Sequence, residues 1–500
     1  MSVRQRMDWL HSWVGIVFGW LGFAIALTGT AAVFKGEMGD WMRPEVAAQV
    51  APDTALANGL RWLAANESNA PAWYLTAPDS RSGTAQVLLQ PGGTGDYRLW
   101  ALDPATGNPK GIRDTLGGEF LYRFHFELEL PYPWGRMIAA IGAMALLIAL
   151  ISGIVTHRRF FADFFTLRTG KGKRSWLDAH NVLGVLPIPF HLMITLTGVL
   201  MLVTLTLPWA TLGVYGGDTA AAARELFPAY VERPAAETPG RLADPAAMIA
   251  QARQQFGGAP IGRISVENPG DARSTVLMWQ NDEQAVPYSK ASVAFDGASG
   301  ALISRYREAR PAMTTYNFLY GLHMGRFGDA ATRWLYFACG LAFSATIATG
   351  LVLWSLSRAD IADRKHAAVA RLSAGAVAGL VLAIAALLWG NRLLPLGLAG
   401  RADWEVRGFF LAWAAALAWS AAVPARWGWR SLLWANAAGW GLLPVVSAGS
   451  VGRGLLVTPG DGLFVAGDLL CLAMAATCGF AAKRMGVARP ARPLRRAVAA

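Results

Sequence analysis

The run of residues 176–208 constrains the fold of this chain more than any other stretch. It is apolar and long enough to span a bilayer, yet it contains His180 and His191. The two histidines are eleven residues apart, so at about 100° per residue a helix would present both rings on one face, roughly 16 Å apart along its axis. Ionisable groups inside a spanning helix are costly and mark functional sites. Paired imidazoles indicate cofactor ligands, most naturally of b-type haem, although a single histidine is more readily explained by a hydrogen bond to backbone.

Composition places the chain in a membrane. Hydrophobic residues make up 54% of its 500 residues, more than a soluble domain contains. The net charge of +12 could suggest a nucleic-acid partner, but the basic residues lie in short loops between apolar runs, as the positive-inside rule describes. The loop before residue 176 is the clearest case, with six basic residues against Asp163: Arg158, Arg159, Arg168, Lys171, Lys173 and Arg174.

Eight apolar runs predict an all-α membrane bundle. They cover residues 13–34, 134–156, 176–208, 334–356, 372–388, 409–423, 432–446 and 463–482. The predicted organisation is a first span in 1–34, an external segment in 35–133, two spans and a basic cytoplasmic loop in 134–210, a second external segment in 211–330, a fourth span in 331–358, and four further spans with a cytoplasmic tail in 359–500. Both termini are predicted to be cytoplasmic.

The two external segments read as small α+β structures. Turn residues separate alternating runs that are typical of strands, at 86–89 and 97–102 in the first segment and at 261–267, 274–279 and 291–295 in the second. Each segment contains a D-x-A-[ST]-G turn, at 103–107 and at 296–300, shortly before a histidine.

The two halves of the chain repeat. His11 is followed by Gly15 and then by the pair 28–29, Thr-Gly, and His180 is followed at the same offsets by Gly184 and the Thr-Gly pair 197–198. His125 precedes the Ser-Gly pair 152–153 and His323 precedes the Thr-Gly pair 349–350, with nearly equal spacing. The duplicated spans therefore predict a four-helix core in which histidines recur at equivalent places.

The repeated residues suggest how a porphyrin would be held. Gly15 and Gly184 lie one turn after a histidine, on the same helix face, and would leave a flat recess. Asp8 and Asp178 precede the histidines and are expected to accept the second imidazole N–H. Close packing of helices is the competing explanation for the glycines.

Six histidines are arranged by depth. His11, His157 and His180 are predicted near the cytoplasmic face, His125 and His323 near the outer face, and His191 within the membrane. The repeat favours His11 with His180 and His125 with His323 as axial ligands of two haem irons. His157 and His191 would form a third site or replace a member of a pair. The remaining histidine, at position 366, lies in a charged loop.

No cysteine offers covalent haem attachment. The three cysteines, Cys339, Cys471 and Cys478, lie in predicted spans, and no CxxCH motif is present, so any haem is non-covalent.

These motifs resemble the PepSY-associated transmembrane family, also called iron-regulated membrane proteins. The resemblance rests on HSWVG and HNVLG with their following Thr-Gly pairs, on LYRFH and LYGLHMGRFG, and on the two D-x-A-[ST]-G strands, over roughly residues 1–358. It implies a bacterial inner-membrane protein with PepSY-like periplasmic segments, and some members of the family are haem-b ferric-siderophore reductases.

The resulting hypothesis is a membrane electron conduit. Electrons from an unidentified cytoplasmic donor would pass through haem b and reduce a periplasmic acceptor, with a ferric siderophore as the leading candidate. A PepSY module that binds or regulates a partner protein is one alternative, and it would not need the histidines. A transporter is another, but it would require polar residues in the last four spans, where few occur.

Overall fold

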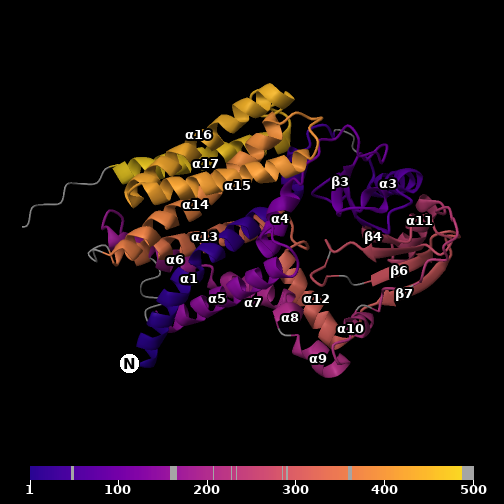
Figure 1. The fold of residues 1–500 in the computed structure, drawn as a ribbon, viewed down its shortest axis with the longest axis horizontal. Coiled ribbons are helices and arrows are strands. Elements are labelled where there is room, and N and C mark those ends of the chain that lie inside the picture. The colour runs from indigo at the N-terminus through magenta and orange to yellow at the C-terminus, as the bar shows by residue number, and fades with distance from the viewer. Residues whose placement is uncertain are drawn as a thin grey trace, which may run out of the picture. The chain divides into compact units, whose positions relative to one another are not determined.

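The computed structural model describes residues 1–46, 50–157, 166–206, 208–226, 228–231, 233–283, 285–288, 291–358 and 363–486. Arg158, Arg159 and Asp163 of the basic loop, and the predicted cytoplasmic tail after residue 486, lie outside this range. The chain divides into two compact units (Figure 1). The first comprises Met1–Trp354 with Pro395–Ala402, and the second comprises Ser355–Leu394 with Asp403–Ala500.

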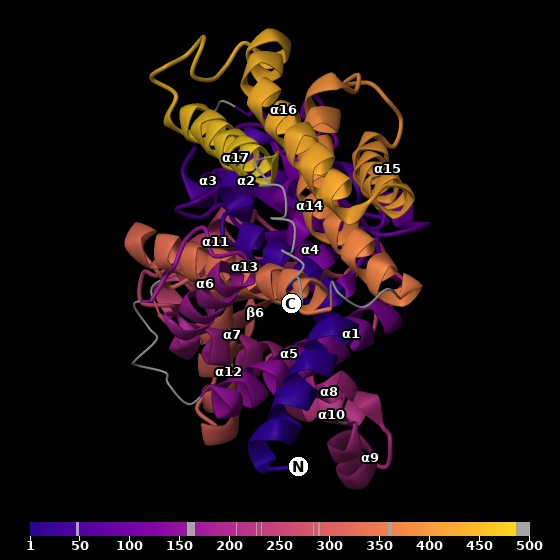
Figure 2. The same cartoon turned by 90° about the vertical axis from the view of Figure 1, so that its left-hand side faces the viewer.

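The first unit is built around four spans. Helix α1 packs along α5, and α5 packs against α7 (Figures 1 and 2). The spanning helices are α1 (Val3–Ala32), α5 (Trp134–Thr156), the pair α6 (Lys173–Val185) and α7 (Ile188–Met201), and α13 (Ala330–Leu356). Shorter helices of this unit are α2 (Lys35–Trp41), α3 (Pro52–Asn66), α4 (Gly118–Glu127), α8 (Val203–Thr206), α9 (Trp209–Tyr215), α10 (Thr219–Leu226), α11 (Pro245–Gln255) and α12 (Pro311–Met324).

The predicted straight helix over residues 176–208 is wrong. Helix α6 ends at Val185 and α7 begins at Ile188, with an angle of 66° between them. Pro187 and Pro189 cause this break because proline has no N–H and its ring clashes with the preceding turn. His180 and His191 therefore lie on different helices and do not share one face.

Six of the described helices are long and apolar enough to cross a membrane, or seven if the bent pair counts as one span. The sequence predicted eight. The difference is α15 (Arg401–Ala422), which is a helix but has charged residues in its first two turns, including Asp403, Glu405 and Arg407. These charges leave its mean hydropathy below that of a span.

The two segments that the sequence predicts to be external contribute to a single antiparallel sheet, which the sequence did not indicate. Its strand order is β3-β2-β1-β4-β5-β6-β7, so the segments join where β1 pairs with β4. The strands are β1 (Ala72–Thr76), β2 (Ala85–Leu89), β3 (Arg98–Leu102), β4 (Ile261–Glu267), β5 (Thr275–Gln280), β6 (Ala291–Asp296) and β7 (Leu302–Arg307), and a single 3₁₀ turn, η1 (Pro91–Gly93), follows β2. The strand runs predicted at 86–89, 97–102, 261–267, 274–279 and 291–295 are confirmed to within one residue.

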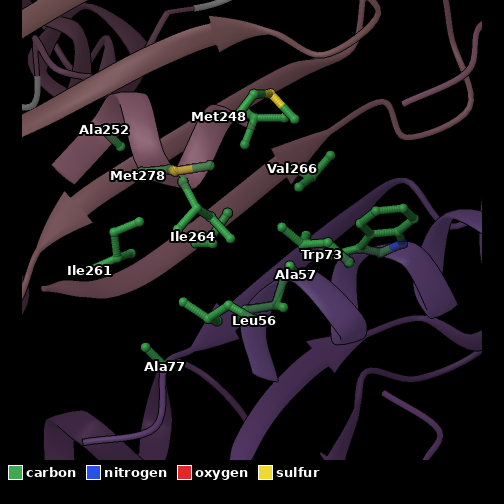
Figure 3. Close-up of a cluster of buried hydrophobic side chains, with 14 of the residues drawn as sticks. Leu56, Ala57, Trp73, Ala77, Met248, Ala252, Ile261, Ile264, Val266 and Met278 are labelled. Atoms are coloured by element: carbon green, nitrogen blue, oxygen red, sulfur yellow. The ribbon is translucent and has the colours of Figure 1, made fainter. Parts of the chain in front are cut away.

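Helices α3 and α11 cover one face of this sheet (Figure 3). Leu56 from α3 and Met248 from α11 are fully buried against strand residues such as Trp73 and Ile264. Alternate strand residues point to this face because side chains alternate along a strand. Each half of the duplication thus supplies one helix and its strands to a common hydrophobic core.

The two D-x-A-[ST]-G turns have the same structure. The Oδ1 atom of Asp103 accepts hydrogen bonds from the backbone N–H and the hydroxyl of Thr106, and the Oδ1 atom of Asp296 accepts the same two bonds from Ser299. The closing glycine has φ of +74° in the first turn and +73° in the second, a conformation that residues with a Cβ rarely adopt. The internal repeat therefore extends to individual hydrogen bonds.

The second unit contains α14 (Arg364–Leu393), most of α15, α16 (Ala425–Val451) and α17 (Gly462–Gly486). Helix α16 packs against both α14 and α17. The expectation of few polar residues in these helices is wrong, because they bury several polar side chains, among them Asn436 and Asp468. In one buried group Asn391 donates to Glu405 at 3.0 Å and Arg392 donates to Ser447 at 3.1 Å.

Candidate functional site

Two histidine pairs form inside the first unit. His11 of α1 lies beside His180 of α6, and His125 of α4 lies beside His323 of α12. The ring centroids are 6.1 Å apart in both pairs, although the interplanar angle is 69° in the first and 27° in the second. The structure therefore brings together the two pairs that the duplication favoured.

A neighbouring helix orients each ring through its Nδ1 atom. In three cases Nδ1 faces a backbone carbonyl oxygen: His11 faces Ala149 at 2.8 Å, His125 faces Ile25 at 2.7 Å, and His180 faces Thr346 at 2.9 Å. A carbonyl only accepts hydrogen bonds, so these Nδ1 atoms carry the proton and the Nε2 lone pair is available to a metal. The Nδ1 atom of His323 lies 3.0 Å from the Thr197 hydroxyl.

Each ring rests on a glycine of the same neighbouring helix. A Cβ atom added to the glycine would lie 2.6 Å from the His125 ring at Gly29, 3.0 Å from His323 at Gly198, 3.1 Å from His11 at Gly153, and 3.2 Å from His180 at Gly350. In the three carbonyl contacts, the accepting residue precedes this glycine by four positions, one helical turn. The Thr-Gly and Ser-Gly pairs of the repeat thus supply the glycines on which the histidine rings pack.

The glycines that follow the histidines do not touch these rings. A Cβ atom at Gly15 would have no neighbour within 4 Å, and one at Gly184 would meet only Thr346, at 3.4 Å. Space is open at Gly15, whereas Gly184 faces Thr346, and a porphyrin recess at either glycine stays a prediction.

The expected role of the aspartates is wrong for Asp178. Its carboxylate binds Arg168 through contacts of 2.7 and 2.8 Å to the guanidinium and 3.0 Å to the backbone N–H. The Nδ1 atom of His180, which was expected to bind this carboxylate, faces the carbonyl of Thr346 instead. Asp8 is exposed at the start of α1.

His191 and His157 take different positions from the paired histidines. His191 is fully buried, its ring packs on Phe343 at 4.6 Å, and its Nε2 atom is hydrogen-bonded to the carbonyl of Cys339 at 3.3 Å. A metal bound at Nε2 would displace that hydrogen bond, whereas the buried Nδ1 atom has no hydrogen-bond partner among the described residues. His157 ends α5 and lies near enough to His180 to interact with it electrostatically.

A cavity of about 290 Å³ contains the His125–His323 pair. Its apolar wall includes Gly29, Leu146 and Phe343. Five basic residues also line it: Lys35, Arg81, Arg136, Arg326 and Arg333. None of the described residues that line it is acidic.

Burial changes the acid–base properties of groups at this cavity. Desolvation lowers the pKa of Lys35, even though the Glu119 carboxylate lies 2.7 Å from its Nζ atom. Burial also raises the pKa of Tyr122 to about 12, so the phenol stays protonated and can donate a hydrogen bond.

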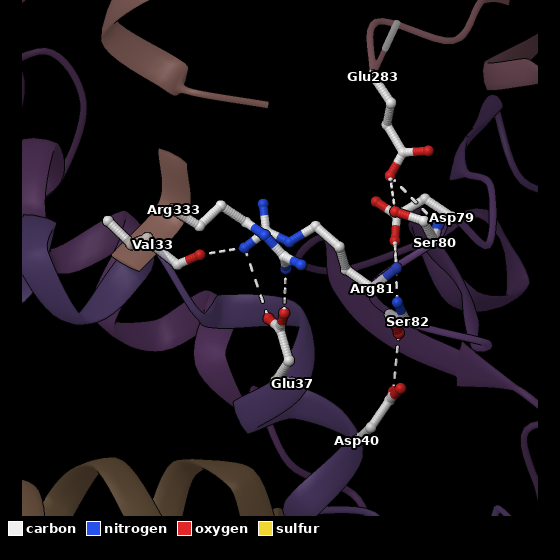
Figure 4. Close-up of polar contacts among 9 residues, drawn as sticks. All are labelled: Val33, Glu37, Asp40, Asp79, Ser80, Arg81, Ser82, Glu283 and Arg333. Atoms are coloured by element: carbon white, nitrogen blue, oxygen red, sulfur yellow. Dashed lines mark hydrogen bonds and ion pairs between the residues drawn. The ribbon is translucent and has the colours of Figure 1, made fainter. Parts of the chain in front are cut away.

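A polar network fixes the sheet to the spans at this cavity (Figure 4). Arg81, in the β1–β2 loop, and Arg333, at the start of α13, both bind the Glu37 carboxylate, at 3.5 and 2.5 Å. Arg81 also donates to the carbonyl of Val33, where α1 ends. The cavity wall is therefore shared by the sheet segment and the helices.

The carbonyl acceptors and the basic lining could not be predicted from the sequence. Backbone carbonyls leave no trace in a sequence, and the basic residues come from five separate elements. The equal offset from histidine to Thr-Gly was the available signal, but only the packing shows which glycine contacts which ring.

Two comparisons with known proteins agree with this architecture. The model of the PepSY-associated TM region matches residues 9–356. The uncharacterized protein PA4219 of Pseudomonas aeruginosa is 28% identical over 333 residues, which cover 62% of this chain and 81% of that protein. The family match covers all four paired histidines and their glycines, and the chain belongs to the family of proteins with a PepSY-associated transmembrane region.

Proposed function

We propose that this membrane protein binds two haem b groups, one at each histidine pair, and transfers electrons from a cytoplasmic donor to an acceptor outside the bacterial inner membrane. The observation that carries the proposal is the repeated pairing of imidazoles with oriented Nδ1 atoms. The leading acceptor is a ferric siderophore. One electron per iron converts Fe(III) to Fe(II), which oxygen-rich chelators hold less well.

The histidine spacing fits axial ligation. Two metal–imidazole bonds of about 2 Å, with roughly 1 Å from each nitrogen to its ring centre, would separate two ligand rings by about 6 Å. The observed centroid distance is 6.1 Å in both pairs. Among the described residues no three His, Cys, Asp or Glu side chains form a metal-binding group. A metal at either pair would therefore bring its remaining ligands with it, as a porphyrin does.

The two pairs are separated by enough of the bilayer to make a path across it. His11 and Ile25, whose carbonyl orients His125, are fourteen residues apart on α1. That separation is roughly 21 Å along the helix, against about 30 Å for the hydrocarbon core. Bound haem would supply reversible one-electron chemistry, while the chain's carbonyls and glycines fix the ligand rings.

An absorption spectrum tests the proposal directly. The purified full-length protein, from haem-replete cells, is expected to show a low-spin bis-histidine haem b spectrum that sharpens on reduction with dithionite. A colourless protein would contradict electron transfer and would favour a module that binds a partner protein.

The proposed topology is tested by cysteine labelling. In a variant without the three native cysteines, Ala65→Cys and Ala250→Cys are expected to react with an impermeant maleimide in intact spheroplasts, because both residues are exposed on the sheet segment. Ala367→Cys, beyond the fourth span, should react only after lysis. Ser274→Cys is the burial control, since only 2% of Ser274 is exposed. Protection of both sheet positions before lysis would contradict the orientation.

A further inference from the structure

Most basic residues around the His125–His323 cavity already have a close carboxylate. Nζ of Lys35 lies 2.7 Å from Glu119, and the Arg136 guanidinium lies 2.5 Å from Glu127. Arg81 and Arg333 share Glu37, as described above. Each of these four residues therefore has a carboxylate of the protein itself within 3.5 Å.

Arg326 differs from the other four. Its nearest carboxylate in the described part of the chain is that of Asp282, at 4.0 Å, the outer limit of an ion pair. The side chain is 29% exposed, and its guanidinium stands 6.0 Å from the Tyr288 ring centre. A guanidinium that lines a cavity without a closely bound carboxylate can accept one from a ligand.

The fold places Arg326 next to the outer histidine pair. Helix α12 ends just after His323 because Gly325 adopts φ of +60°, and a Cβ there would also press on the Tyr336 ring at 3.0 Å. The chain turns at this glycine, and Arg326 follows in the cavity wall. In the first half of the repeat, Leu128 stands three residues after His125, so the cation is specific to one half.

We propose that the Arg326 guanidinium binds a carboxylate of the molecule that occupies this cavity. The proposal rests on the proposed function in taking haem as that molecule, since its two propionates are carboxylates. A carboxylate of the acceptor is the other source of the same chemistry.

The test compares Arg326→Gln and Arg326→Lys with the wild type and with Arg123→Gln. Arg123 is the matched control because it lies on α4, is bound to Glu127 and does not line the cavity. Haem-depleted full-length protein is titrated with ferric protoporphyrin IX and with its dimethyl ester. In a separate titration, binding of citrate is measured by calorimetry.

We expect Arg326→Gln to weaken binding of the protoporphyrin about tenfold at one of the two sites while leaving the dimethyl ester unaffected. Arg326→Lys should recover part of the loss, and Arg123→Gln should match the wild type. If only citrate binding weakens in Arg326→Gln, the carboxylate that Arg326 binds belongs to the acceptor, and this result also supports the proposed carboxylate site.

Unchanged affinity of Arg326→Gln for both protoporphyrin and citrate would overturn the carboxylate site. A wild-type protein that takes up neither porphyrin would instead refute the proposed function. The citrate titration then decides the Arg326 site by itself: a loss confined to the Arg326 variants supports it, and no loss overturns it.

Discussion

Replacing His323 with alanine is expected to remove the outer haem and to leave the inner one in place. The haem-to-protein ratio should fall from about two to about one, because only the outer iron would lose one of its two protein ligands. The inner haem should still be reduced from the cytoplasmic side, while reduction of an external ferric substrate is blocked.

His180→Ala is the mirror experiment. It should remove the inner haem and slow reduction of the outer haem from inside, but dithionite added outside should still reduce the outer haem. Haem content and stopped-flow reduction in oriented vesicles measure both effects. His366→Ala is the control, since His366 belongs to the second unit and its Nδ1 atom lies 3.2 Å from the Asp363 carboxylate.

Full haem content and turnover in both variants would show that these histidines are packing residues and do not bind haem. Loss of all haem from both would point to unfolding, and His323→Gln and His180→Gln, which preserve side-chain polarity, would then be compared by the same measurements.

Replacing Gly29 with alanine is expected to disrupt the outer histidine without removing it. The new Cβ would lie 2.6 Å from two atoms of the His125 ring, which is closer than carbon atoms can approach. The ring must therefore move away from residue 29 and lose its hydrogen bond to the Ile25 carbonyl. We expect loss of the outer haem or a high-spin spectrum at that site.

Gly350→Ala should have a smaller effect at the inner pair, because its Cβ would be 3.2 Å from the His180 ring. Gly408→Ala is the control, since no atom lies within 4 Å of the added carbon. Absorption spectra and thermal unfolding measure the effect in each variant. We expect the largest change in Gly29→Ala, a smaller one in Gly350→Ala and the smallest in Gly408→Ala. Equal spectra for Gly29→Ala and the control would contradict the packing of the His125 ring on Gly29.

The sequence by itself determined the membrane character, the duplication, most strands and the identity of the paired histidines. Each of these depends on a local pattern: apolar length, alternation, or an equal offset such as that from His11 to Gly29 and from His180 to Gly198. Internal repetition was informative because equivalent residues of two similar halves tend to meet across a pseudo-twofold axis.

Only the tertiary structure decided the details of the site. The bend at Pro187 separated His180 from His191, and the pairing of β1 with β4 merged two segments into one sheet. Asp178 bound Arg168 instead of a histidine, while the Thr346 carbonyl oriented His180. These outcomes depend on which groups of distant elements lie within contact distance of one another in the folded chain. Residue type and spacing along the chain do not determine those distances.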